Sequence, residues 1–183
     1  MRLRGRRLTM VLTIVLLVVV GGGASAAWAL GKTRPAMPEG YTAGPTDDSV
    51  VQLSVTAGEH SRAGEVQQTV QRYFDSINRR DFQAWQTVVG ADQSANQTED
   101  DWVTAYSTTV DSNLVVAAIA DDPLRVRMMF TSEQAPEFAP RRLPAPCINW
   151  DLTYLLAEQD GGLVLSGIEP SKQSMTACEQ PSK

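Results

Sequence analysis

The spacing of hydrophobic residues changes partway along this chain, and that change sets the fold class. From residue 61 apolar side chains recur at helical intervals, and residues 64–79 predict an amphipathic helix with Val66, Val70 and Phe74 on one face. Asp81 is placed to cap a second, short helix. Thr98, followed three residues later by Asp101, predicts the start of a third.

After the third predicted helix the period falls to two, which is typical of strands. The alternation predicts strands over residues 113–120, 124–130, 147–158 and 163–168. Asp160-Gly161 is a strong signal for a two-residue hairpin turn between the last two. Helices followed by a four-stranded antiparallel meander predict an α+β domain, and about 120 residues suffice for one core.

The N-terminal residues differ in kind from the rest. Arg2, Arg4, Arg6 and Arg7 precede a charge-free run from residue 8 to residue 31, which as a helix reaches roughly 36 Å, enough to span a bilayer core. Arginines on that side place the N-terminus in the cytoplasm and the remainder outside. Residues 1–31 are therefore a signal anchor or, alternatively, a cleaved signal peptide of a secreted protein. Residues 32–60 read as a flexible linker, 61–179 as the folded domain and 180–183 as a tail.

Export bears on the two cysteines, Cys147 and Cys178. An oxidising compartment favours a disulfide between them, which would restrict the unfolded chain by roughly 3 to 4 kcal/mol. Two cysteines and one distant histidine, His60, make a poor ligand set, so neither a metal nor another cofactor is expected.

Charge excludes some classes of partner. Of 16 basic residues four precede the apolar run, which leaves 12 basic against 21 acidic residues in the exported part. So acidic a surface argues against binding nucleic acid.

The stretch from Val66 to Val89 carries a family resemblance. Its aromatic pair Tyr73-Phe74, then Asn78, Arg79-Arg80 and Asp81, resembles the opening of the nuclear-transport-factor-2-like superfamily, as found in small membrane-anchored actinobacterial exported proteins. The resemblance implies a cone fold, in which a curved antiparallel sheet wraps around helices, and also implies that homodimers are an option. It does not imply one activity, because the superfamily includes isomerases, dehydratases, ligand carriers and non-enzymatic interaction domains.

Catalytic signals are weak, so no catalytic residue is assigned. The leading interpretation is a non-enzymatic, membrane-tethered extracytoplasmic domain that binds an envelope protein or a small apolar ligand. The alternative is a cone-type isomerase or hydratase whose base is Asp75 or Asp151, paired with a tyrosine such as Tyr106 or Tyr154. Candidate binding residues are large aromatics and two arginines of a proline-rich connection, namely Trp102, Tyr106, Trp150, Tyr154, Arg141 and Arg142.

Overall fold

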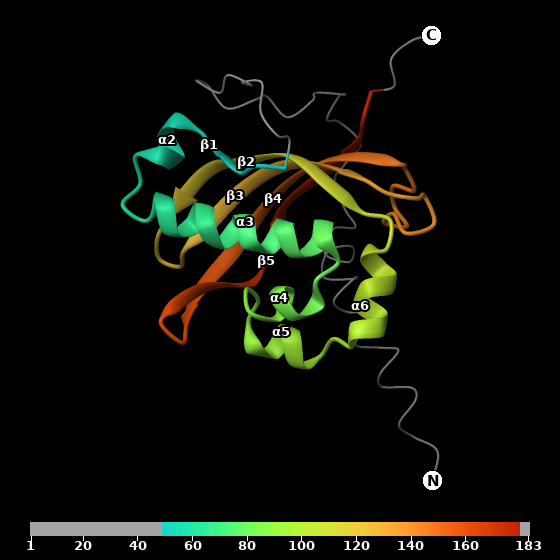
Figure 1. Cartoon of the computed structure of the whole chain (residues 1–183). Coiled ribbons are helices and arrows are strands. Elements are labelled where there is room, and N and C mark those ends of the chain that lie inside the picture. Colours follow the sequence, from blue (N-terminus) through green and yellow to red (C-terminus); the bar gives the residue numbers. More distant parts are fainter. Residues whose placement is uncertain (1–48, 180–183) are drawn as a thin grey trace.

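The computed structural model describes residues 49–179, which form a five-stranded sheet with helices packed on it (Figure 1). The sheet order is β1-β2-β3-β4-β5; β1 is parallel to β2, and all other neighbours are antiparallel. The elements in chain order are β1 (Gln52–Leu53), α2 (Val55–Gly58), α3 (Ala63–Arg79), α4 (Phe82–Gln86), α5 (Ala91–Ala95), α6 (Glu99–Tyr106), β2 (Val110–Ala120), β3 (Arg125–Glu133), β4 (Cys147–Gln159) and β5 (Gly162–Ala177). The α+β class is confirmed.

The long helix α3 lies across one face of the curved sheet, and α4, α5 and α6 gather towards its C-terminal end (Figure 1). Its apolar face buries Val66, Val70 and Phe74 against sheet residues such as Met128 and Leu152. Arg80 ends the helix in the left-handed conformation, with φ 56°, and its N–H bonds to the carbonyl of Ile77. A second core lies beyond that end and contains Ile77, Phe82, Trp85, Val89 and Trp102.

Both predicted helix caps are confirmed. The side chain of Asp81 accepts a hydrogen bond of 2.9 Å from the amide of Ala84 at the start of α4. The hydroxyl of Thr98 accepts one of 3.2 Å from the amide of Asp101 at the start of α6. Each satisfies a backbone donor that the first helical turn leaves without a partner.

The Asp160-Gly161 turn is also confirmed, but the strand after it is longer than predicted. Both turn residues have positive φ, 53° and 82°, as a tight two-residue hairpin requires. The strand predicted to end at residue 168 continues as β5 and pairs with β4 as far as Ala177 opposite Ile148. Polar residues in this stretch hide its strand character from a search for apolar alternation.

The four-stranded sheet and the linker boundary need correction. Residues 49–60, predicted as the end of a linker, contribute the fifth strand β1 and the helix α2. Val51 and Ala57 are fully buried in the main core, and the Ser54 hydroxyl donates to the carbonyl of Ala117 on β2. The short helix α5 was not predicted either.

The predicted anchor, residues 1–31, lies outside the described residues. Among residues 49–179, no helix has both the length and the apolar character needed to cross a bilayer.

The predicted disulfide joins Cys147 to Cys178 and pins the end of β5 to the start of β4. Next to the disulfide, the backbone amide of Cys178 donates to the carbonyl of Cys147 at 3.0 Å. This hydrogen bond continues the ladder between β4 and β5 as far as the disulfide.

We expect Cys147→Ala with Cys178→Ala to lower the free energy of unfolding by about 3 to 4 kcal/mol, because the unfolded chain regains the entropy of an open loop. Urea unfolding measures the loss, and hydrogen exchange should show the amides of residues 173–177 losing protection first. Reduced wild-type protein is the matched control and should behave like the variant. Unchanged stability in both would contradict a structural role for the bond.

Candidate functional site

Polar side chains from five elements meet between α3 and the sheet. Tyr73 comes from α3, Tyr106 from α6, Asp111 from β2, Ser132 from β3 and Tyr154 from β4. We call these five residues the phenol–carboxylate cluster. It lies where the two cores adjoin, since Tyr73 packs against both of them.

Regular secondary structure explains how the side chains converge. Tyr154 shares a face of β4 with the buried Leu152 and Leu156. Asp111 and Ser132 are register partners on β2 and β3, so their side chains point to the same side of the sheet. Tyr73 precedes Phe74 on the buried side of α3 and is half-buried.

Short-range interactions link the members of the cluster. The Ser132 hydroxyl donates to Oδ1 of Asp111, and both residues are buried. The Tyr73 phenol interacts electrostatically with the phenols of Tyr106 and Tyr154. The rings of Tyr73 and Tyr154 meet edge to face, with centroids 5.8 Å apart.

The backbone of Asp111 is held by Asn78, at the end of α3. The Asp111 amide donates to Asn78 Oδ1 at 2.7 Å, and Asn78 Nδ2 donates to the Asp111 carbonyl at 2.9 Å. Arg80 adds bonds from its guanidinium to the carbonyls of Ser107 and Thr109, at 3.1 and 3.3 Å. Asn78 and Arg80 therefore fix the position of Asp111 relative to α3.

Burial makes the carboxyl of the cluster an unusual acid. It raises the pKa of Asp111 from 3.8 to about 6, although the hydrogen bond from Ser132 acts in the opposite direction. Burial, with Asp111 nearby, also raises the pKa of Tyr106 to about 12 and raises the pKa values of Tyr73 and Tyr154. At neutral pH the phenols are therefore protonated and can donate hydrogen bonds. The carboxyl of Asp111 loses its proton as the pH rises through about 6.

Two buried indole donors have no hydrogen-bond partner in the described part of the chain, and one of them packs against the cluster. Nε1 of Trp102 and Nε1 of Trp150 are buried without a hydrogen bond to any described residue. The Trp102 ring lies 5.1 Å from that of Tyr106, and the Trp150 ring stacks at 6.1 Å on Phe130. An unpaired buried donor costs about 1 to 3 kcal/mol, so both indoles can gain from a bound acceptor.

Three of the six predicted binding residues lie in or beside the cluster. Tyr106 and Tyr154 belong to it, and the ring of Trp102 contacts that of Tyr106, whereas Trp150 contacts Phe130, which is not a member. The sequence did not identify Asp111, Ser132 or Tyr73 as site residues. The residues around Asp111 carry no signal, because its hydrogen-bond partners Asn78 and Ser132 lie 33 and 21 positions away.

Arg141 and Arg142 lie apart from those aromatics, exposed on the connection between β3 and β4. Hydrogen bonds hold that connection in place: the backbone amide of Gln134 donates to the carbonyl of Pro146, and the backbone amide of Ala135 donates to the hydroxyl of Thr108. Phe138 is 40% exposed on it. The connection therefore presents a fixed surface rather than contributing to the cluster.

The two carboxylates considered as catalytic bases lie elsewhere. Asp151 lies on the opposite face of β4 from Trp150, as predicted, and forms a two-pronged ion pair with Arg127 at 2.6 and 2.8 Å. Asp75 accepts from Gln71 at 3.0 Å and pairs with Arg79 at 3.5 Å. Neither is joined to a tyrosine by any interaction in the described part of the chain, so the structure does not bring either of them into an Asp-Tyr pair.

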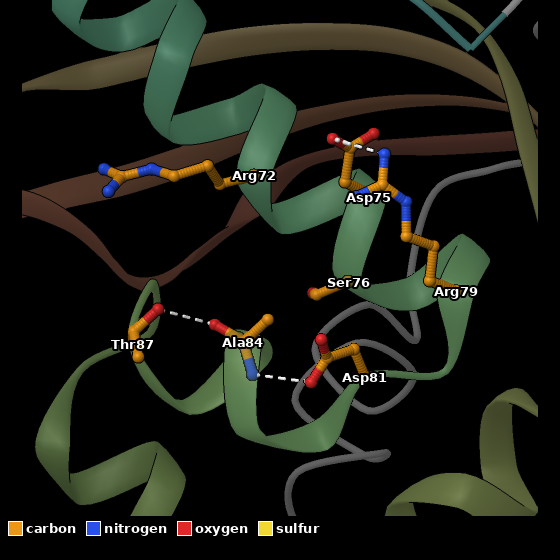
Figure 2. A pocket seen from close by; sticks show the side chains of 7 residues that line it. All are labelled: Arg72, Asp75, Ser76, Arg79, Asp81, Ala84 and Thr87. Atoms are coloured by element: carbon orange, nitrogen blue, oxygen red, sulfur yellow. Dashed lines mark hydrogen bonds and ion pairs between the residues drawn. The ribbon is translucent and has the colours of Figure 1, made fainter.

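Asp75 and Arg79 line a hollow between α3 and α4 (Figure 2). Its polar groups satisfy one another: besides the Asp75–Arg79 pair, Asp81 caps α4, and the Thr87 hydroxyl donates to the Ala84 carbonyl at 2.7 Å. No buried polar group without a partner faces this hollow among the described residues. We therefore place the candidate site at the phenol–carboxylate cluster.

Comparison with protein-family models, with curated proteins and with solved structures finds no match. The resemblance to the nuclear-transport-factor-2-like superfamily thus stays a prediction.

The raised pKa of Asp111 predicts a pH-dependent stability. Because the folded state holds this proton more tightly than the unfolded state, the stabilising effect is fully present below the unfolded pKa of 3.8 and is lost as the pH rises through about 6. The loss is about 3 kcal/mol, since each pKa unit corresponds to about 1.36 kcal/mol. Asp111→Asn keeps an acceptor for Ser132 but does not titrate, and it should remove that part of the pH dependence.

Urea unfolding of wild type and Asp111→Asn between about pH 4 and pH 7 measures the difference, because all other groups contribute equally to both proteins. Glu137→Gln, at an exposed carboxylate, is the matched control and should follow wild type. Parallel curves for wild type and Asp111→Asn would show that Asp111 titrates normally.

Proposed function

We propose that this protein is a non-enzymatic ligand-binding domain, tethered by its N-terminal residues to the outer side of the membrane. Its ligand is a small, mainly apolar molecule with a polar group, held at the phenol–carboxylate cluster. An envelope protein as partner, reached through the connection that carries Arg141 and Arg142, remains part of the proposal, as does a homodimer.

The observation that carries this proposal is the buried carboxylate of Asp111, with the unpaired indole of Trp102 packed against Tyr106. Folding gains little from such polar groups, because apolar side chains would fill the same space at lower free energy. A ligand that bonds to these groups would recover part of that cost. The surrounding rings, Phe74, Phe130 and Trp150 among them, supply apolar contact for its body.

The proposal is tested with a neutral probe, 2-naphthalenemethanol, which combines an apolar body with one hydroxyl. We expect saturable binding to the full chain by titration calorimetry, with quenching of tryptophan fluorescence. Tyr106→Phe removes one hydroxyl and should weaken binding about fivefold, the value of one hydrogen bond of about 1 kcal/mol. Ser107→Ala, at an exposed neighbouring hydroxyl, is the control; absence of saturable binding to wild type would contradict the proposal.

One observation favours a second function, a cone-type isomerase or hydratase. A carboxyl with a pKa of about 6 beside protonated phenols has the composition of a general base with a facing hydrogen-bond donor. Asp111 would remove the proton, and a phenol would stabilise the oxyanion that forms.

This function predicts that the full chain accelerates exchange of the α-protons of 2-tetralone in D₂O, followed by NMR. The rate should rise with pH through about 6, because only ionised Asp111 accepts a proton. Asp111→Asn should lower it at least about a hundredfold, whereas Asp75→Asn should leave it unchanged. An exchange rate equal to that in buffer without protein would contradict the enzymatic function, and the binding function would be the one that stands.

A further inference from the structure

Among the described residues, no positively charged side chain pairs with the carboxylate of Asp111. It is 4% exposed, and the ion pairs that involve His60, Arg62, Arg79 and Arg127 are all formed with other acidic residues. Arg80, which is held to the segment before Asp111, uses its guanidinium on three backbone carbonyls. A buried charge that lacks its counterion is costly, and buried charges in proteins are normally paired.

One oxygen of this carboxylate is left for a ligand. Oδ1 accepts from Ser132, whereas none of the hydrogen bonds among the described residues ends on Oδ2; since Oδ2 is not one of the buried atoms without a partner, solvent reaches it. Asn78 holds both backbone polar groups of Asp111 and so fixes where its side chain begins. A donor that enters the cluster therefore meets a carboxylate oxygen already in place.

The groups around Asp111 also suit a positive charge. Every titratable group facing it is a phenol: Tyr73 from α3, Tyr106 from α6 and Tyr154 from β4. An aromatic ring attracts a cation through its face, by about 0.5 to 2 kcal/mol according to desolvation. Phenol oxygens can in addition accept hydrogen bonds from an ammonium group.

We propose that the ligand is a small organic cation, a protonated amine on an apolar body, whose ammonium group pairs with Asp111 among the three phenols. This inference rests on the proposed binding function and names its ligand class. A neutral ligand can use the same apolar walls, but it leaves the carboxylate without a counterion.

The pairing couples binding to protonation of Asp111. At a pH below its pKa of about 6 the carboxyl is neutral, so an incoming ammonium must displace the proton. At higher pH the carboxylate is ready to pair. The phenols stay protonated over this range, since burial raises their pKa values, and Ser132 and Asn78 do not titrate.

The experiment compares two probes of one shape that differ in charge, 2-naphthylmethylammonium and neutral 2-naphthalenemethanol. Both are titrated calorimetrically into the full chain at about pH 5 and about pH 7.5. We expect the cation to bind at least tenfold more tightly than the alcohol at the higher pH, and to weaken about tenfold at the lower pH, where about a tenth of Asp111 is ionised. The alcohol should bind equally at both.

Asp111→Asn should abolish the advantage of the cation over the alcohol and the pH dependence of its binding. Glu137→Gln, which removes an exposed charge, should bind both probes as wild type does and so excludes a general electrostatic effect. Equal binding of the two probes by wild type would overturn this inference and leave the proposed function intact. If neither probe binds, the proposed function fails and the inference fails with it.

Discussion

The pairing between the Asn78 side chain and the backbone of Asp111 joins the helical half of the domain to the start of its sheet. It fixes where β2 begins relative to the end of α3, and so brings Asp111 beside Tyr73. Asn78 lies in the last turn of α3, just before Arg80 ends the helix in the left-handed conformation. The arrangement of the candidate site therefore depends on a contact made at the end of α3.

The phenol–carboxylate cluster is difficult to explain by stability alone. Apolar side chains pack on either side of it: Val66, Val70 and Phe74 belong to one core, and Phe82, Trp85 and Trp102 to the other. Between them the chain places a carboxyl whose pKa rises because it is buried, and the indole donor of Trp102, which packs against Tyr106, has no partner among the described residues. A buried polar network that is only partly satisfied costs more than an apolar one of the same volume, which is why we connect this region with a ligand.

What the sequence could predict depended on how local each signal is. The caps at Asp81 and Thr98 and the Asp160-Gly161 turn act within three or four residues, and the structure has all of them. The strand β1 has only two residues and is held by β2, more than sixty positions later, so the apolar residues between 50 and 55 are only a weak signal for it. Tyr106 and Tyr154 were found because large rings stand out, whereas Asp111 looks like any solvated acid until α3 and β3 pack against it.

The two candidate functions differ in how Asp111 becomes ionised. Both use Asp111, but a catalytic base must be ionised beside a neutral substrate, whereas a cation-binding carboxylate loses its proton because the ligand binds. A bound ammonium would lower the pKa of Asp111 and so weaken it as a base. The more tightly the cluster holds an organic cation, the less suited it is to proton abstraction, and an ammonium ligand would therefore favour a binding domain over an enzyme.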